Sequence, residues 1–152
     1  MGVDNSYKSS SAEQQMAEEL VFYNLERKLG IRLERNKHIY LANNVHIEPD
    51  FYSEVESIIG EIFVHIGKPK KAQNNKIAND ILKMILLEKV RGKKYRKMIV
   101  VCDKEEEKTL YGTSYVAESI RQFDVEIIYI ELDEETRSAI FMAQKRQRMV
   151  NQ

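Results

Sequence analysis

The chain has 152 residues, of which 43% are hydrophobic and 32% are charged, with only two prolines and six glycines. This composition excludes collagen-like, low-complexity and broadly disordered proteins, and it leaves room for one globular domain of ordinary size. The 24 basic and 24 acidic side chains cancel, which argues against a protein that coats nucleic acid through bulk positive charge.

The cysteine content and the hydropathy of the chain indicate the cellular compartment in which the protein resides. A single cysteine, Cys102, excludes an internal disulfide framework and a Cys-based zinc cluster, and it fits a reducing compartment. No apolar run approaches the ~20 residues needed to span a bilayer, and residues 1–15 lack the apolar stretch of a secretory signal. We therefore expect a cytoplasmic protein with no membrane partner.

The first third of the chain predicts an arm, a helix and a hairpin. Residues 1–11 are polar and rich in serine, as is typical of a flexible arm. From Ala12 to Leu29 apolar side chains recur at three- and four-residue steps, which predicts a long helix. Residues 38–41 and 45–48 are short strand candidates, and the Asn43-Asn44 dipeptide between them favours a tight turn.

The rest of the chain alternates strands and helices. Ile58 to Ile66 is almost continuously apolar, which predicts a central strand covered on both faces. The elements that follow are a helix at 72–90, a strand at 98–102, a helix at 110–123, a strand at 125–132 and a helix at 133–149. Three strands that pair as an antiparallel meander, followed by strand–helix crossovers, predict an α/β three-layer sandwich around a mixed central sheet. We expect residues 12–152 to form a single domain.

Two acidic residues stand out because of where they lie relative to the predicted strands. Asp50 directly follows Pro49, and Glu61 interrupts the hydrophobic strand. A buried carboxylate costs several kcal/mol unless it is paired, hydrogen-bonded or bound to a cation. If residues 47–50 pair with residues 58–61 as adjacent antiparallel strands, the two acids meet at a sheet end and form an oxygen-ligand site for Mg²⁺ or Mn²⁺. A salt bridge from Glu61 to a helix lysine is the alternative.

Three features together resemble the PD-(D/E)xK nuclease superfamily, which has a restriction-endonuclease-like fold. They are Ala17-Glu18 on the first helix, the Pro49-Asp50 pair, and Glu61-Ile62-Phe63 within a hydrophobic strand. The element order α-β-β-β-α-β-α-β extends the resemblance over most of the chain. It implies that the aspartate and the glutamate bind a divalent metal, that the helix acid supports the site, and that a lysine two residues after the glutamate positions the attacking water.

The chain departs from this pattern at the lysine, because Phe63 occupies that position. One hypothesis is that the next helix supplies the cation. Its residues Gln73, Lys76, Asp80 and Lys83 fall on one stripe at helical spacing. Lys76 is then the candidate that orients the nucleophilic water, and Gln73 resembles a helix glutamine of exonuclease-like relatives. The alternatives are a helix stripe that merely faces water and a degenerate site that has lost cleavage.

Local charge suggests where a nucleic acid would bind. Acidic residues gather at 103–107 and 131–135, so we expect surface patches of opposite sign. Basic clusters would contact the phosphate backbone if they flank the acidic site. The candidate contacts are Lys68, Lys70, Lys71, Lys93 and Lys94.

The sequence therefore predicts a Mg²⁺- or Mn²⁺-dependent phosphodiesterase that acts on nucleic acid, with DNA endonuclease activity as the first hypothesis. Asp50 and Glu61 would hold the ion, and Lys76 would help an activated water attack the phosphodiester in line. Glu18 and Gln73 complete the candidate catalytic set. Because no target-recognition module is evident, we expect a homodimer that reaches both strands, with the closing helix as a candidate interface.

Two other functions remain open on the sequence. Phe63 in the lysine position favours a catalytically degenerate DNA-binding or assembly module that keeps the nuclease fold. The second is a small-molecule or nucleotide-binding α/β domain. The chain contains neither GxGxxG nor GxxxxGK(S/T), which disfavours a nucleotide-binding domain.

Overall fold

The computed structural model describes the backbone of residues 5–150 and the side chains of residues 12–150. Its helices are α1 (Asn5–Leu29), α2 (Lys71–Arg91), α3 (Lys104–Leu110), α4 (Tyr115–Gln122) and α5 (Glu134–Val150). Its strands are β1 (Glu34–Arg35), β2 (Ile39–Tyr40), β3 (His46–Ile47), β4 (Phe51–Ser53), β5 (Ile58–Phe63), β6 (Arg96–Val101) and β7 (Val125–Tyr129).

Five of the strands form one mixed sheet in the order β1-β4-β5-β6-β7. β1, β4 and β5 are antiparallel neighbours, whereas β5, β6 and β7 run parallel. β5 lies in the middle of this sheet, and all six of its residues are buried. The predicted α/β class, the mixed sheet and the central position of the apolar strand are therefore confirmed.

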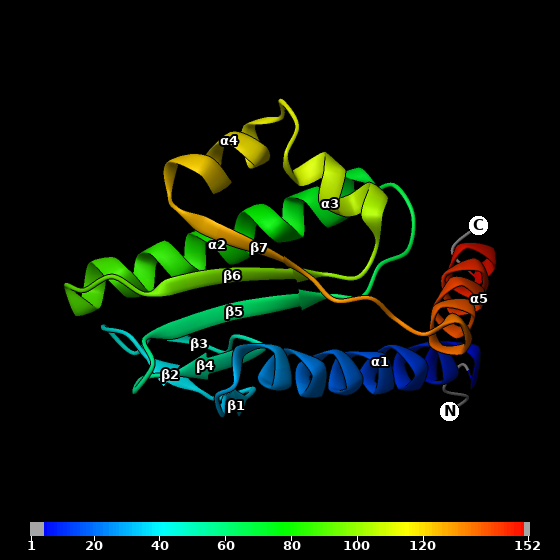
Figure 1. The fold of residues 1–152 in the computed structure, drawn as a ribbon, viewed down its shortest axis with the longest axis horizontal. Coiled ribbons are helices and arrows are strands. Elements are labelled where there is room, and N and C mark those ends of the chain that lie inside the picture. Colours follow the sequence, from blue (N-terminus) through cyan, green and yellow to red (C-terminus); the bar gives the residue numbers. More distant parts are fainter. Residues whose placement is uncertain (1–4, 151–152) are drawn as a thin grey trace.

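Helices cover both faces of the sheet (Figure 1). Ile58 and Ile62 of β5 belong to one apolar cluster with Leu25 of α1, and α5 adds to the same layer. Ile59 faces the other way and packs in a second cluster with Ile77 of α2. This alternation follows from the two-residue period of a strand. The arrangement is compatible with the predicted three-layer sandwich.

The predicted hairpin is present, but it stands apart from the main sheet. Ile39 pairs with Ile47 and Tyr40 with His46 in a two-stranded unit of β2 and β3. The turn residues Asn43 and Asn44 have φ angles of 54° and 62°, a left-handed conformation that asparagine tolerates better than most residues. The meander in the main sheet consists of β1, β4 and β5 instead.

The predicted pairing of residues 47–50 with residues 58–61 is wrong, because β4 takes that place. Phe51 lies opposite Gly60 in the β4–β5 register. A Cβ atom at Gly60 would collide with the Phe51 ring, so the glycine makes room for the aromatic side chain. This contact between two strands fixes a register that strand periodicity alone did not reveal.

The helix predicted over 110–123 is present but starts later, as α4 at Tyr115, and the sequence did not predict α3, which precedes it and ends at Leu110. Two side chains start these helices separately. The Asp103 carboxylate accepts the N–H of Glu105, and the Ser114 hydroxyl oxygen accepts the N–H of Ala117. Each N-cap satisfies backbone donors that a continuous helix would have bonded internally.

The first helix begins earlier than the sequence predicts. α1 starts at Asn5, within the 1–11 segment expected to be an arm. Residues 1–4 lie outside the described part of the chain, so the flexible arm stays a prediction for those four residues alone. Among the helices described, none combines the length and apolar character that a membrane span requires.

Candidate active site

Asp50 and Glu61 meet where the sheet splits. The β4–β5 pairing stops at Phe51 and Gly60, so β4 has no residue opposite Glu61 or Ile62. The Ile62 N–H instead donates to Asp50 Oδ2 at 2.8 Å. The Asp50 N–H donates to Glu61 Oε2 at 3.2 Å. The two acids therefore lie together, although through a different strand pairing from the predicted one.

Two helix acids lie near enough to this pair for charge to act between them, and Glu18, Asp50, Glu61 and Asp80 are together called the acid cluster here. Glu61 and Asp80 are only 5% and 3% exposed. Burial, the charges of Asp50 and Asp80, and a hydrogen bond between the Asp50 and Glu61 carboxyl groups raise the pKa of Glu61 to about 10. Burial and the charge of Asp50 also raise the pKa of Glu18.

Asp80 joins this cluster from α2, and burial raises its pKa. Its Oδ1 lies 3.4 Å from the Lys83 ammonium, but its Oδ2 is buried without a hydrogen-bond partner among the described residues. Asp80 is therefore the member of the α2 stripe whose charge acts on Glu61. The sequence placed Asp80 on this stripe but did not select it as a site residue.

Lys76 brings a positive charge to the same place. Its ammonium lies 5.1 Å from the centroid of the Phe63 ring, a cation–π contact. The charge of Lys76 opposes the rise in pKa at both Glu18 and Asp80. The side chain itself is exposed, and it has no ion pair within the described residues. A cation from α2 thus sits over the aromatic ring that replaces the expected lysine.

Gln73 lies at the start of α2. Its side-chain oxygen accepts the Lys70 N–H at 2.7 Å, which caps the first turn of α2. It forms no hydrogen bond with the acid cluster within residues 12–150. Gln73 therefore lies one turn before Lys76 and lines a neighbouring cavity.

The two predicted basic clusters lie at opposite ends of α2. Lys68, Lys70 and Lys71 lead into the helix, and Lys93 and Lys94 follow it. A helix of 21 residues is ~30 Å long, so the clusters do not form one continuous surface. The Lys93 ammonium is also engaged with Glu54 Oε1 at 2.9 Å.

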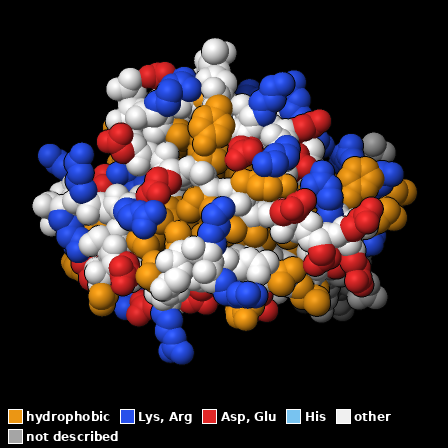
Figure 2. Space-filling view, in the orientation of Figure 1, with side chains coloured by type: hydrophobic (Ala, Val, Ile, Leu, Met, Phe, Trp, Pro, Cys, Tyr) orange, Lys and Arg blue, Asp and Glu red, His pale blue; other side chains and the backbone are white. Residues whose placement is uncertain are grey.

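Charges on the visible surface are mixed. On the face shown in Figure 2, blue and red side chains alternate, and large patches of one sign are not present there. The predicted separation into extended patches is not seen on this face.

The donor set of Asp50 and Glu61 fits a magnesium ion. Within residues 12–150, no group of three or more His, Cys, Asp or Glu side chains lies together as a metal site. Mg²⁺ in proteins is commonly held by only one or two carboxylates, and waters and substrate oxygens complete its shell. Two converging carboxylates with a raised Glu61 pKa are the surroundings in which a divalent cation offsets mutual repulsion.

Comparisons with protein-family models, with curated proteins and with solved structures each find no match. The assignment of a function therefore depends on the arrangement of these side chains. The resemblance to PD-(D/E)xK nucleases stays a proposal.

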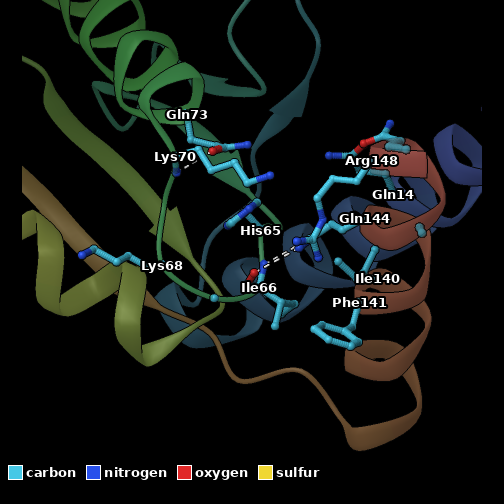
Figure 3. A pocket seen from close by; sticks show the side chains of 13 residues that line it. Gln14, His65, Ile66, Lys68, Lys70, Gln73, Ile140, Phe141, Gln144 and Arg148 are labelled. Atoms are coloured by element: carbon cyan, nitrogen blue, oxygen red, sulfur yellow. Dashed lines mark hydrogen bonds between the residues drawn. The ribbon is translucent and has the colours of Figure 1, made fainter. Parts of the chain in front are cut away.

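The structure also has a cavity that the sequence did not predict. It has a volume of about 420 Å³ and is lined by residues of α1, α2, α5 and the segment between β5 and α2 (Figure 3). Gln144 of α5 holds one wall, because its side-chain oxygen accepts the Ile66 N–H and its amide donates to the Ile66 carbonyl. A contact between residues 78 positions apart leaves no local signal in the sequence.

Proposed function

We propose that this protein is a metal-dependent phosphodiesterase of the PD-(D/E)xK type that cleaves nucleic acid, with DNA as the first substrate to test. One observation carries the proposal. Asp50 and Glu61 converge at the split in the sheet, and the Lys76 ammonium lies over the neighbouring Phe63 ring.

The backbone fixes both acids before any ligand arrives. The Ile62 N–H orients the Asp50 carboxylate, and the Asp50 N–H orients Glu61. Such fixed positions reduce the reorganisation needed during a reaction. A bound Mg²⁺ or Mn²⁺ would neutralise the acids, activate water and stabilise charge on a phosphoryl oxygen. Glu18 adds negative charge from α1, where Arg35 lies 3.9 Å from its carboxylate.

Lys76 takes the role that the pattern gives to the missing lysine. Its exposed ammonium has three donors for a phosphate oxygen or a water. The Phe63 ring below holds the charge near the acids without consuming those donors in an ion pair. In this proposal the aromatic face of Phe63 holds the Lys76 ammonium in place, and α2 supplies the cation that the strand lacks.

A second candidate is a catalytically degenerate module that binds nucleic acid without cleaving it. The observation in its favour is Phe63, which is 5% exposed and offers no proton donor where the pattern has lysine. Lys76 must then serve only as a contact for the backbone phosphates. No observation favours a nucleotide-binding domain.

Cleavage assays separate these candidates. Supercoiled plasmid, linear duplexes, single-stranded DNA and RNA are incubated with the protein in Mg²⁺, Mn²⁺ or EDTA. We expect metal-dependent loss of substrate that disappears in Glu61→Gln and Asp50→Asn and persists in the matched control Glu135→Gln, whose side chain is exposed on α5. Retention on a gel without loss supports the degenerate module. Equal cleavage by Glu61→Gln and the wild type contradicts the proposed site.

A homodimer stays part of the proposal as the means of reaching both strands of a duplex. α5 exposes Phe141, Met142 and Met149, which agrees with its selection as the interface. Light scattering coupled to size-exclusion chromatography measures the assembly directly. A monomeric protein that nicks only one strand would contradict the proposed dimer but not the proposed site.

A further inference from the structure

The cavity shown in Figure 3 has an unusual lining. Its 13 lining residues include Lys68, Lys70 and Arg148, and none of them is Asp or Glu. Among the described residues, neither Lys70 nor Arg148 forms an ion pair with a carboxylate. A cavity with unpaired cations and no acid favours an anionic ligand.

Two of the positive charges converge from separate elements. Burial lowers the pKa of His65, a hydrogen bond with the Gly67 backbone and the charge of Asp103 raise it, and the charges of Lys70 and Arg148 lower it. Lys70 precedes α2, whereas Arg148 belongs to the last turn of α5, so both approach the same histidine from different sides. Lys68 is different, because Figure 3 shows its side chain extending away from the other labelled groups.

Neutral donors complete the lining. Gln14 of α1, Gln73 of α2 and Gln147 of α5 also border the cavity. The Gln73 oxygen is used by the Lys70 N–H, which leaves its amide group as a donor. The first turn of the 21-residue helix α2 lies at this border, and free N–H groups at a helix start favour anions.

Two helices lead from the cavity toward the acid cluster. Gln14 and Glu18 are four residues apart on α1, and Gln73 and Lys76 are three residues apart on α2. Each pair therefore spans about one turn, or ~5.4 Å along the axis. Successive phosphates of one strand in a duplex rise by ~3.4 Å. A strand at the acid cluster would place a phosphate one or two nucleotides away in this cavity.

We propose that this cavity is a phosphate-binding subsite in which Lys70 and Arg148 hold a phosphate of the substrate strand beside the acid cluster. The identity of the strand rests on the proposed function, whereas phosphate binding itself requires no cleavage. A terminal phosphate and an internal phosphodiester share the chemistry that these side chains recognise.

Binding without metal tests the subsite. Fluorescent single-stranded DNA oligonucleotides with a 5′-phosphate, a 3′-phosphate or hydroxyl ends are titrated with wild-type protein, Lys70→Gln and Arg148→Gln in EDTA. Lys89→Gln is the matched control, because it removes the same charge from an exposed position near the other end of α2. Inorganic phosphate serves as the competitor, and thermal melting checks that each variant folds.

We expect each cavity variant to weaken binding by about tenfold and to lower the salt dependence by about one counterion, while Lys89→Gln changes little. If the wild type prefers oligonucleotides with a terminal phosphate and Arg148→Gln abolishes this preference, the subsite binds strand ends. Equal weakening for all oligonucleotides assigns it to internal phosphates. Wild-type affinity in both cavity variants, failure of inorganic phosphate to compete, or no binding by folded wild-type protein overturns the proposal.

This result is distinct from the outcome of the cleavage assays. If no substrate is cleaved but binding still depends on Lys70 and Arg148, the subsite stands and the nuclease proposal fails. If cleavage depends on Glu61 but binding does not depend on Lys70 or Arg148, the nuclease proposal stands and the subsite fails.

Discussion

His65 Nδ1 lies 3.8 Å from Glu106 Oε2, and this pair is not an ordinary salt bridge. Glu106 is fully buried, and neither of its carboxyl oxygens has a hydrogen-bond partner among the described residues. Burial, followed by the charge of Asp103, raises the pKa of Glu106 to about 8, while burial lowers the pKa of His65. At neutral pH the pair therefore consists of a protonated carboxyl group and a neutral imidazole.

Glu106→Gln should change how stability depends on pH. Because the folded-state pKa of about 8 lies above the ordinary glutamate value of 4.5, the folded chain holds an extra proton between these values. The free energy of unfolding therefore falls as pH rises through this window, by at most ~1.4 kcal/mol per pH unit. The variant lacks this loss and should exceed the wild type in stability above pH 8. Urea denaturation from pH 5 to pH 9 measures it, with exposed Glu105→Gln as the control. Parallel wild-type and Glu106→Gln profiles would contradict the raised pKa.

Glu61→Gln should stabilise the metal-free protein or leave its stability unchanged at neutral pH. Burial and the charges of Asp50 and Asp80 raise the Glu61 pKa to about 10, so the wild-type protein loses stability as pH rises from the ordinary glutamate pKa toward that value. Glutamine removes the titration and keeps an oxygen for the Asp50 N–H. The advantage of the variant should grow between pH 6 and pH 9 in thermal unfolding with EDTA. A large drop in melting temperature would indicate a structural salt bridge instead.

Lys76→Met should abolish most of the cleavage and leave the fold intact. Methionine keeps an apolar contact with the Phe63 ring but removes the ammonium 5.1 Å from it. We expect a loss in kcat of about 100-fold or more, the usual contribution of a positioned proton-transfer group. Lys89→Gln is the control on the same helix, because this exposed lysine lies near the other end of α2. Unchanged kcat in Lys76→Met would remove Lys76 from the site.

A double variant tests whether the lysine has moved from the strand to the helix. Phe63→Lys in the Lys76→Met background places an ammonium at the position that the PD-(D/E)xK pattern uses. If the two positions supply the same function, part of the lost cleavage should return. A folded double variant with no recovery would show that the Lys76 contribution depends on its own place on α2.

Gly60→Ala should damage both the fold and the site. The added Cβ would meet the Phe51 ring and the Met98 carbonyl oxygen, the latter at 2.8 Å. Overpacking of this kind costs about 1–3 kcal/mol, and it displaces β4, which directly follows Asp50. Denaturation gives the first effect, and metal-dependent cleavage gives the second. A variant as stable and as active as the wild type would contradict the role of the Phe51–Gly60 contact.

The sequence predicted the features that arise from local chemistry. Asn43-Asn44 marked the hairpin turn, the apolar run located the central strand β5, and an acid within that run required a partner. Each of these signals comes from residues that are close together in the sequence, so it can be recognised without knowledge of the fold.

The features that the sequence missed depend on distant contacts. The place of β4 beside β5 follows from a ring that fills the space above Gly60. The cavity follows from α5 returning to the end of β5, where Gln144 bonds to Ile66. Asp80 lay on a predicted stripe, but only the packing of α2 on β5 brings it to Glu61. Hydrophobic periodicity carries no information about these contacts.

Direct measurement of Mn²⁺ binding by isothermal titration calorimetry tests the central claim, that Asp50 and Glu61 jointly hold a divalent ion. The wild-type protein should bind one Mn²⁺ per chain at neutral pH and release protons, because the Glu61 pKa is raised. Glu61→Gln and Asp50→Asn should each lose this binding, whereas Glu135→Gln should keep it. Absence of binding by folded wild-type protein, or equal binding by all four proteins, would contradict the account.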